Sequence, residues 1–119
     1  EFRISETFNS SYEEEDKPLE IRDRAIAAAQ IAMSKKAKDV LVLELKELTI
    51  IADYFVICSG DSTTQVKAIS DSIKEEFSKK RIRLVGAEGL SHGRWVLMDY
   101  GDVIIHIFYS ETRYYYQIE

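Results

Sequence analysis

The sequence is poor in the residues that build covalent or metal cross-links, with one cysteine and two histidines among 119 residues. A single cysteine excludes a disulfide within the chain, and no set of Cys and His residues has the spacing of a zinc site. No apolar run approaches the roughly 20 residues of a membrane-spanning helix, and no basic start followed by an apolar stretch indicates a signal peptide. We therefore expect a reduced, intracellular setting, with no metal, cofactor or membrane.

Positive charge is also scarce, because 16 Lys and Arg residues face 21 Asp and Glu residues, for a net charge of −5. Wrapping around a phosphate backbone requires clustered basic residues, so we expect no direct sequence-specific binding of nucleic acid. An acidic surface suits a basic protein as partner. The length and the 45% hydrophobic content indicate one globular domain.

The first 19 residues differ in character from the rest of the chain. They are polar, carry an acidic run at residues 13–16 and contain the only proline, Pro18. We predict a flexible acidic tail over residues 1–19 and a single folded domain over residues 20–119.

Hydrophobic periodicity in that domain predicts an α/β fold. Helical spacing marks residues 21–37, a helix opened by Ser62 and a last helix from Glu111, and Ser62 with Gln65 forms a capping-box pattern. Short apolar runs predict strands at residues 40–45, 53–60, 81–86 and 94–99, and the stretch 99–108 supplies a fifth. The order predicts a mixed five-stranded sheet flanked by helices.

The stretch DYGDVIIHIF, residues 99–108, predicts a hairpin with the preceding strand. A two-residue loop of Tyr100 and Gly101 would place Trp95 opposite His106. One face of the hairpin is then ordinary core. The other carries Trp95, Leu97, Asp99, Asp102, Ile104, His106 and Phe108. Such a mixture is typical of a protein-binding surface, although the face could equally pack beneath a loop or the last helix.

The residues offer little chemistry. Asp99 and Asp102 meet only across a turn, where they bond to local N–H groups, and Cys58 lies in a buried strand. The turn SGDST, residues 59–63, resembles the corner of nucleotidyltransferases, and a helix N-terminus can hold a phosphate. Those enzymes also need paired strand carboxylates to hold magnesium, and none is found downstream. We therefore expect no catalytic residues and no enzyme, with nucleotide binding at this turn as the alternative.

Three segments closely resemble the ribosomal silencing factor family, also called Iojap-like. They are ADYFVICSGDSTTQVKAISDSI (52–73), EGLSHGRWVLMDYGDVIIHIF (88–108) and ETRYYYQIE (111–119). The likeness extends from about residue 20 to the end, and the acidic tail is not part of the family pattern. The resemblance implies a nucleotidyltransferase-like fold without catalytic carboxylates.

The resemblance also implies a function and a site. Family members bind the large ribosomal subunit through its protein number fourteen, block joining of the small subunit and so repress translation when nutrients are scarce. Bacterial members are cytoplasmic, relatives act in organelles, and crystals often contain homodimers. The partner-binding residues implied here are Trp95, Asp99, Tyr100, Asp102, His106 and Tyr115. An adaptor that recognises another basic protein through the same face is a further alternative.

Overall fold

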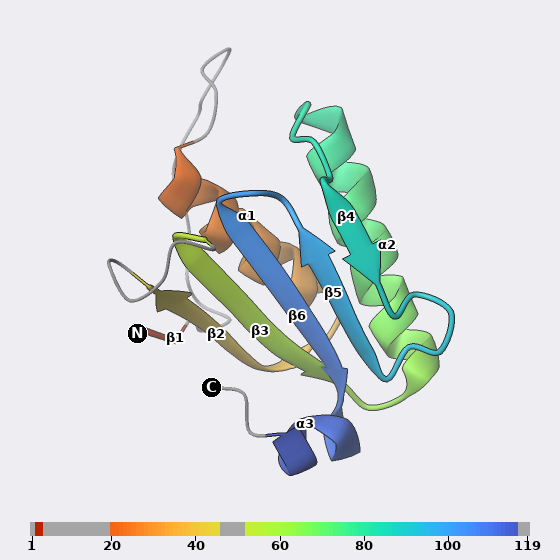
Figure 1. Ribbon diagram of the computed structural model, residues 1–119. Helices are drawn as coiled ribbons and strands as arrows, with labels where there is room; N and C mark the ends of the chain where they lie inside the picture. The colour runs from red at the N-terminus through yellow and green to blue at the C-terminus, as the bar shows by residue number, and fades with distance from the viewer. Residues whose placement is uncertain (1, 4–19, 46–51, 117–119) are drawn as a thin grey trace.

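The computed structural model describes residues 2–3, 20–45 and 52–116, with the side chains of residues 2–3 and 114–116 excepted (Figure 1). Within these residues the elements are β1 (Phe2–Arg3), α1 (Ile21–Ser34), β2 (Lys38–Glu44), β3 (Tyr54–Gly60), α2 (Thr63–Lys79), β4 (Gly86–Glu88), β5 (Trp95–Asp99), β6 (Val103–Tyr109) and α3 (Ser110–Tyr116). No described helix is long and apolar enough to cross a membrane.

The described strands form one sheet in the order β1-β2-β3-β6-β5-β4. The β3–β6 pair is parallel, and the other pairs are antiparallel. The predicted fold class is therefore confirmed, because β2 to β6 make the expected mixed five-stranded sheet. The two-residue strand β1 extends its edge, although these two residues fall in the segment expected to be a flexible tail. The rest of that segment lies outside the described residues, so the division of the chain at residue 20 stays a prediction.

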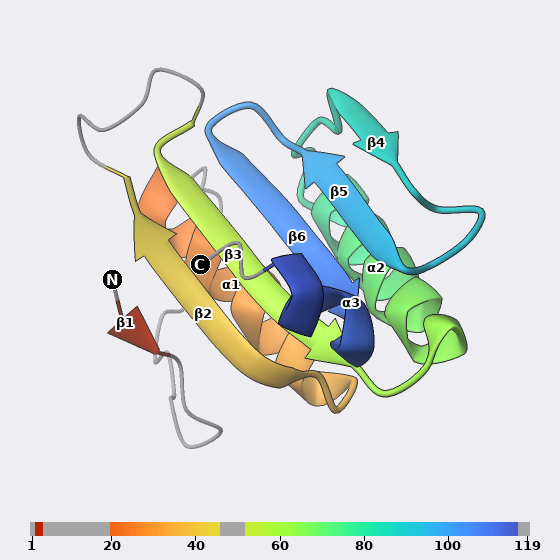
Figure 2. The same ribbon diagram turned by 60° about the horizontal axis from the view of Figure 1, so that its bottom comes forward.

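Helices α1 and α2 cover one face of the sheet, whereas the short α3 lies on the opposite face (Figure 2). The main core forms between the sheet and the two long helices. It contains fully buried side chains from α2, β3, β5 and β6, among them Ile69, Phe77, Val56, Met98 and Ile105. Five alanines on α1, of which Ala25, Ala28, Ala29 and Ala32 are completely buried, let this helix approach the sheet closely.

Helix α2 begins as its sequence predicts. The Ser62 hydroxyl accepts a hydrogen bond from the Gln65 backbone N–H at 3.0 Å, and the Gln65 side chain accepts one from the Asp61 N–H. The pair thus satisfies two backbone donors at the start of the helix. The amide of Gln65 also donates to the carbonyls of Lys35 and Lys36, which ties the start of α2 to the end of α1.

The hairpin of β5 and β6 has the predicted faces, but its predicted register was wrong by two residues. Trp95 lies opposite Phe108, and Leu97 lies opposite His106. The loop is Gly101 and Asp102, closed by a bond from the Tyr100 N–H to the Val103 carbonyl at 2.9 Å. Gly101 takes φ +90° at the first loop position, where type II′ hairpin turns require glycine. A shift of two keeps every side chain on its face, so periodicity could not detect the difference.

The strand predicted at residues 81–86 was also wrong, since β4 begins only at Gly86. The residues before it end α2. Ile82 donates to the Phe77 carbonyl and Arg81 to the Ser78 carbonyl, which is the pattern of a Schellman cap. The side chain of Ile82 is 7% exposed and packs into the core. The apolar residues that predicted a strand therefore belong to the end of a helix.

Candidate functional site

The sheet face opposite α1 and α2, which is turned toward the viewer in Figure 2, carries a second apolar layer that we call the outer face. It is built from residues that alternate with core residues along four strands: Leu41, Leu43, Phe55, Ile57, Trp95, Leu97, Ile104, His106 and Phe108. Near its middle the face is tightly packed, since Ile57 and Phe108 are fully buried. Phe55, Trp95 and Leu97 remain partly exposed, so the face presents both a packed floor and accessible apolar groups.

Aromatic rings on β3, β5 and β6 pack around His106. The ring of Phe55 meets it edge-on with centroids 4.8 Å apart, and Phe108 stacks parallel to it at 6.2 Å. Trp95 packs on Phe108 at 4.9 Å and donates its indole N–H to His106 Nδ1 at 3.2 Å. The cluster therefore holds the indole in one orientation at the start of β5.

His106 is neutral in this setting. Burial lowers its pKa to about 4, since the ring is only 4% exposed. Because Nδ1 accepts the indole N–H, the proton of the neutral ring lies on Nε2. That Nε2 is buried and has no hydrogen-bond partner among the described residues. The histidine thus positions Trp95. With so low a pKa, its imidazole is a poor general acid or base at neutral pH.

A pocket of about 850 Å³ opens beside Trp95, between the loop that joins β4 to β5 and the helix α3. Its walls combine apolar, charged and polar residues: Glu88, Gly89, His92, Arg94, Trp95, Leu97 and Thr112. The loop reaches the strand closely at Gly89, which has φ +84° and where a Cβ atom would lie 2.0 Å from the Trp95 carbonyl oxygen. An aromatic anchor beside a mixed pocket is the arrangement that protein interfaces use.

The other predicted site residues are placed differently. Asp99 ends β5 on the outer face and accepts a hydrogen bond from the Gly101 N–H at 2.8 Å, while Asp102 is exposed in the turn. Tyr100 lies on the opposite side of the sheet, where its ring meets Phe77 of α2. The side chain of Tyr115 lies outside the described residues. The structure thus brings Trp95 and His106 together, with Asp99 on the same face, but turns Tyr100 away.

Arg113 was missed by sequence reasoning. This α3 residue is only 7% exposed and donates to the Asp39 carbonyl at 2.8 Å and to the Ser59 hydroxyl at 2.9 Å. It thereby fastens α3 across the ends of β2 and β3. Arg113 is followed by three tyrosines, and the pattern of residues around it does not predict that it is buried.

The turn at residues 59–63 uses its polar groups internally. Ser59 accepts from Arg113, the Gly60 carbonyl accepts from the Ser110 hydroxyl at 2.9 Å, and Ser62 caps α2. Asp61 pairs with Lys38 at 3.0 Å. These bonds account for the turn as a structural corner, and nothing in its geometry favours a nucleotide.

Burial makes Cys58 a poor nucleophile. Cys58 is fully buried, and burial raises its thiol pKa to about 12, which is the opposite of what a nucleophile needs. Among the residues that the structure describes, no three His, Cys, Asp or Glu side chains are grouped so as to hold a metal ion.

Comparison with known proteins gives a consistent result. The sequence model of the family described as "Ribosomal silencing factor during starvation" matches residues 18–119. The chain is 41% identical over 92 residues to ribosomal silencing factor RsfS of Bacillus subtilis, which covers 77% of this chain and 78% of the relative. It is 31% identical to the chloroplastic protein Iojap of Zea mays, covering 89% of this chain and 46% of that longer protein.

Solved structures agree with the sequence match. A crystal structure of a protein from Chromobacterium violaceum superposes with a TM-score of 0.82 and 35% identity, covering 85% of this chain and 84% of that one. A second, from Bacillus halodurans, gives a TM-score of 0.72 and 36% identity, covering 82% and 89%.

Proposed function

The chain belongs to the ribosomal silencing factor family, and we propose that it represses translation by binding the large ribosomal subunit. In this proposal it contacts the subunit's protein number fourteen and blocks joining of the small subunit when nutrients are limiting. The setting is the bacterial cytoplasm. The observation that carries the proposal is the outer face, where Trp95 is held by His106 beside a pocket of about 850 Å³.

Steric exclusion requires a firm contact and no reaction. Trp95 serves as the anchor, because an indole already oriented by its neighbours loses little freedom on binding and contributes a large apolar area. Leu97 and Phe55 extend the apolar contact along the sheet.

The polar candidates act around this anchor. Asp99 and Asp102 lie at the turn end of β5, where carboxylates can pair with basic side chains of a ribosomal protein. Exposed pairs of this kind contribute about 0–1 kcal/mol each and mainly orient the partner. Tyr115 stays a candidate contact. Tyr100 acts indirectly, by packing the turn onto α2.

A homodimer belongs to the same proposal. The partly exposed Trp95 and Leu97 offer apolar area for a second copy as well as for the ribosome. Light scattering after size exclusion, with wild type and Trp95→Ala compared at one concentration, shows whether self-association uses the outer face.

The test is sedimentation in a sucrose gradient with purified large subunits, followed by addition of small subunits. Wild type should co-migrate with large subunits and lower the yield of whole ribosomes. Trp95→Ala should lose about tenfold or more in affinity, as central aromatic anchors do. The matched control is Val85→Ala, which removes an exposed apolar side chain, 64% exposed, away from the outer face. Circular dichroism confirms that both variants are folded.

Two results would contradict the proposal. If wild type stays at the top of the gradient, the chain does not bind large subunits, and a nucleotide titration at the 59–63 turn or a search for another basic protein partner follows. If Trp95→Ala binds as tightly as wild type, the subunit is bound by another face.

A further inference from the structure

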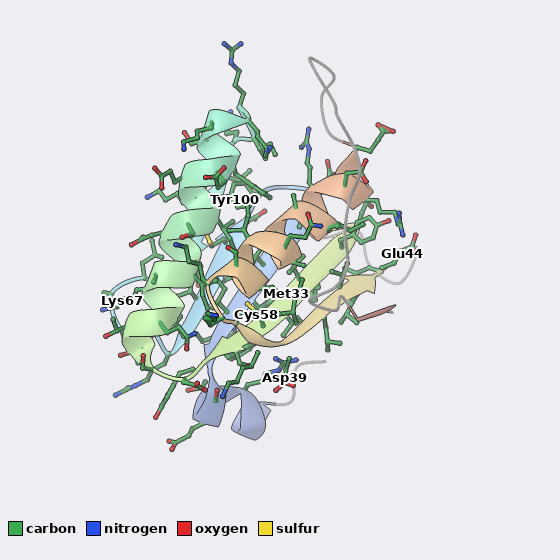
Figure 3. The ribbon with its side chains drawn as sticks, turned by 180° about the vertical axis from the view of Figure 1, so that it is seen from behind. Met33, Asp39, Glu44, Cys58, Lys67 and Tyr100 are labelled. Atoms are coloured by element: carbon green, nitrogen blue, oxygen red, sulfur yellow. The ribbon has the colours of Figure 1, made fainter. Side chains whose placement is uncertain are left out.

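A second pocket lies at the other end of β5, between the end of α2 and the segment that leads to β4. It has a volume of about 340 Å³ and is lined by Lys74, Ser78, Arg81, Ile82, Arg83, Leu84 and Tyr100. Trp95 and Tyr100 are five residues apart along an extended strand, which corresponds to about 17 Å. Tyr100, which lines the pocket, lies on the helix-covered side of the sheet (Figure 3), so the pocket is separate from the outer face.

The charge of this pocket is unusual for so acidic a chain. Three of its lining residues, Lys74, Arg81 and Arg83, are cationic, and none is anionic. The nearby carboxylates of Glu75 and Glu76 instead approach Lys79, at 4.0 Å and 3.7 Å. Within the described residues, the three cations of the pocket make no ion pair. All three are exposed to solvent, so a bound anion can reach them.

Tyr100 is the buried aromatic residue among those that line the pocket. The residue is 6% exposed, its ring packs edge-on against Phe77 at 4.8 Å, and its hydroxyl has no hydrogen-bond partner among the described residues. Leaving a buried hydroxyl unsatisfied costs about 1–3 kcal/mol. Burial raises the pKa of Tyr100 to about 12, so the group remains a hydrogen-bond donor at neutral pH. Because the hydroxyl itself is buried, the groups of the pocket that an anion can reach are the three cations.

The backbone at Arg81 adds a useful feature. Arg81 has φ +61° at the first position after the α2 cap, a left-handed conformation in which glycine is favoured. Lys36 has φ +70° at the equivalent position after α1, where Ala37 donates to the Ala32 carbonyl. Both positions hold a basic residue with positive φ, and glycine would relieve the backbone strain at either one. Only Arg81 lines the pocket. Lys36 is therefore a matched control.

We propose that this pocket binds a phosphate group, with Lys74, Arg81 and Arg83 as its cationic ligands. Guanidinium groups match phosphate oxygens with paired hydrogen bonds, and hydrogen bonds between charged groups are the stronger ones. The phosphate can come from an RNA backbone or from a small phosphorylated molecule. In either case the contact reads charge and not base sequence, and it does not depend on the outer face.

The experiment measures binding of two probes to the full chain at low salt, about 50 mM. A fluorescently labelled RNA oligonucleotide is titrated by anisotropy, and inorganic pyrophosphate by calorimetry. Wild type should bind at least one probe. Arg81→Gly should weaken that binding about tenfold or more while raising the urea midpoint of unfolding. Lys36→Gly should raise the midpoint similarly and leave the affinity unchanged.

The outcomes separate the sources and test the site. Binding of RNA without pyrophosphate assigns a backbone phosphate, whereas binding of both with similar affinity assigns a free phosphate group. No binding of either probe at millimolar concentration overturns the proposal. It is also overturned if Lys36→Gly weakens binding as much as Arg81→Gly, because the effect would then follow net charge alone. Since no ribosome is present, failure here leaves the proposed silencing function untouched.

Discussion

Replacing His106 by Phe should remove a specific part of the acid sensitivity of this fold. The folded-state pKa of His106 is lowered to about 4 by burial, whereas an unfolded histidine titrates near about 6.5. As pH falls below about 6.5, the unfolded chain takes up a proton that the folded chain refuses, so stability falls. The loss levels off near pH 4, where the folded protein also binds the proton.

The two pKa values set the size of the effect. Linkage gives a loss of about 2 kcal/mol in the free energy of unfolding between about pH 7.5 and pH 5 from this one residue. A phenylalanine ring keeps the packing against Phe55 and Phe108 but cannot titrate. The lost bond from the Trp95 indole adds a constant offset at both pH values, which cancels in the difference between them.

The assay is urea unfolding followed by circular dichroism at several pH values for wild type and His106→Phe. The stability of the variant relative to wild type should rise by about 2 kcal/mol on going from about pH 7.5 to pH 5. A relative stability of His106→Phe that stays constant within about 0.5 kcal/mol would refute the reasoning, because His106 would then titrate alike in both states.

Three further substitutions test local features, each by the free energy of unfolding in urea. Ser62→Ala should cost about 1 kcal/mol, because it removes the acceptor at the start of α2; no loss would show that the cap is dispensable. Gly89→Ala should cost about 2–3 kcal/mol, because its Cβ would collide with the Trp95 carbonyl at φ +84°, and the indole fluorescence should shift as β5 moves; an unchanged protein would contradict this close approach. Arg113→Met should cost about 1–3 kcal/mol, because it leaves the Asp39 carbonyl without this donor; a neutral effect would mean that α3 is held by other contacts.

Local chemistry alone was enough to predict much of this fold. Ser62 and Gln65 predicted the start of α2, because a capping box satisfies backbone donors wherever it occurs. Alternation along residues 95–108 predicted which side chains share the outer face with Trp95, since a strand exposes successive residues on opposite sides. The quoted motifs predicted the family, which the comparisons confirm.

The remaining features arise from contacts between distant segments. Arg113 becomes buried because β2 and β3 end beside α3, and Tyr100 meets Lys74 and Arg83 in one pocket because the turn of the hairpin packs against the end of α2. Contacts of this kind cannot be predicted from the pattern of neighbouring residues.

The sequence by itself determined most of the elements, the faces of the hairpin strands and the family, because these depend on neighbours along the chain. Only the tertiary structure decided the register of β5 on β6, the side on which Tyr100 lies and the basic pocket at the end of α2. The physical reason is that a two-residue shift preserves alternation, so the choice fell to Gly101, which alone accepts φ +90° at the first position of the loop.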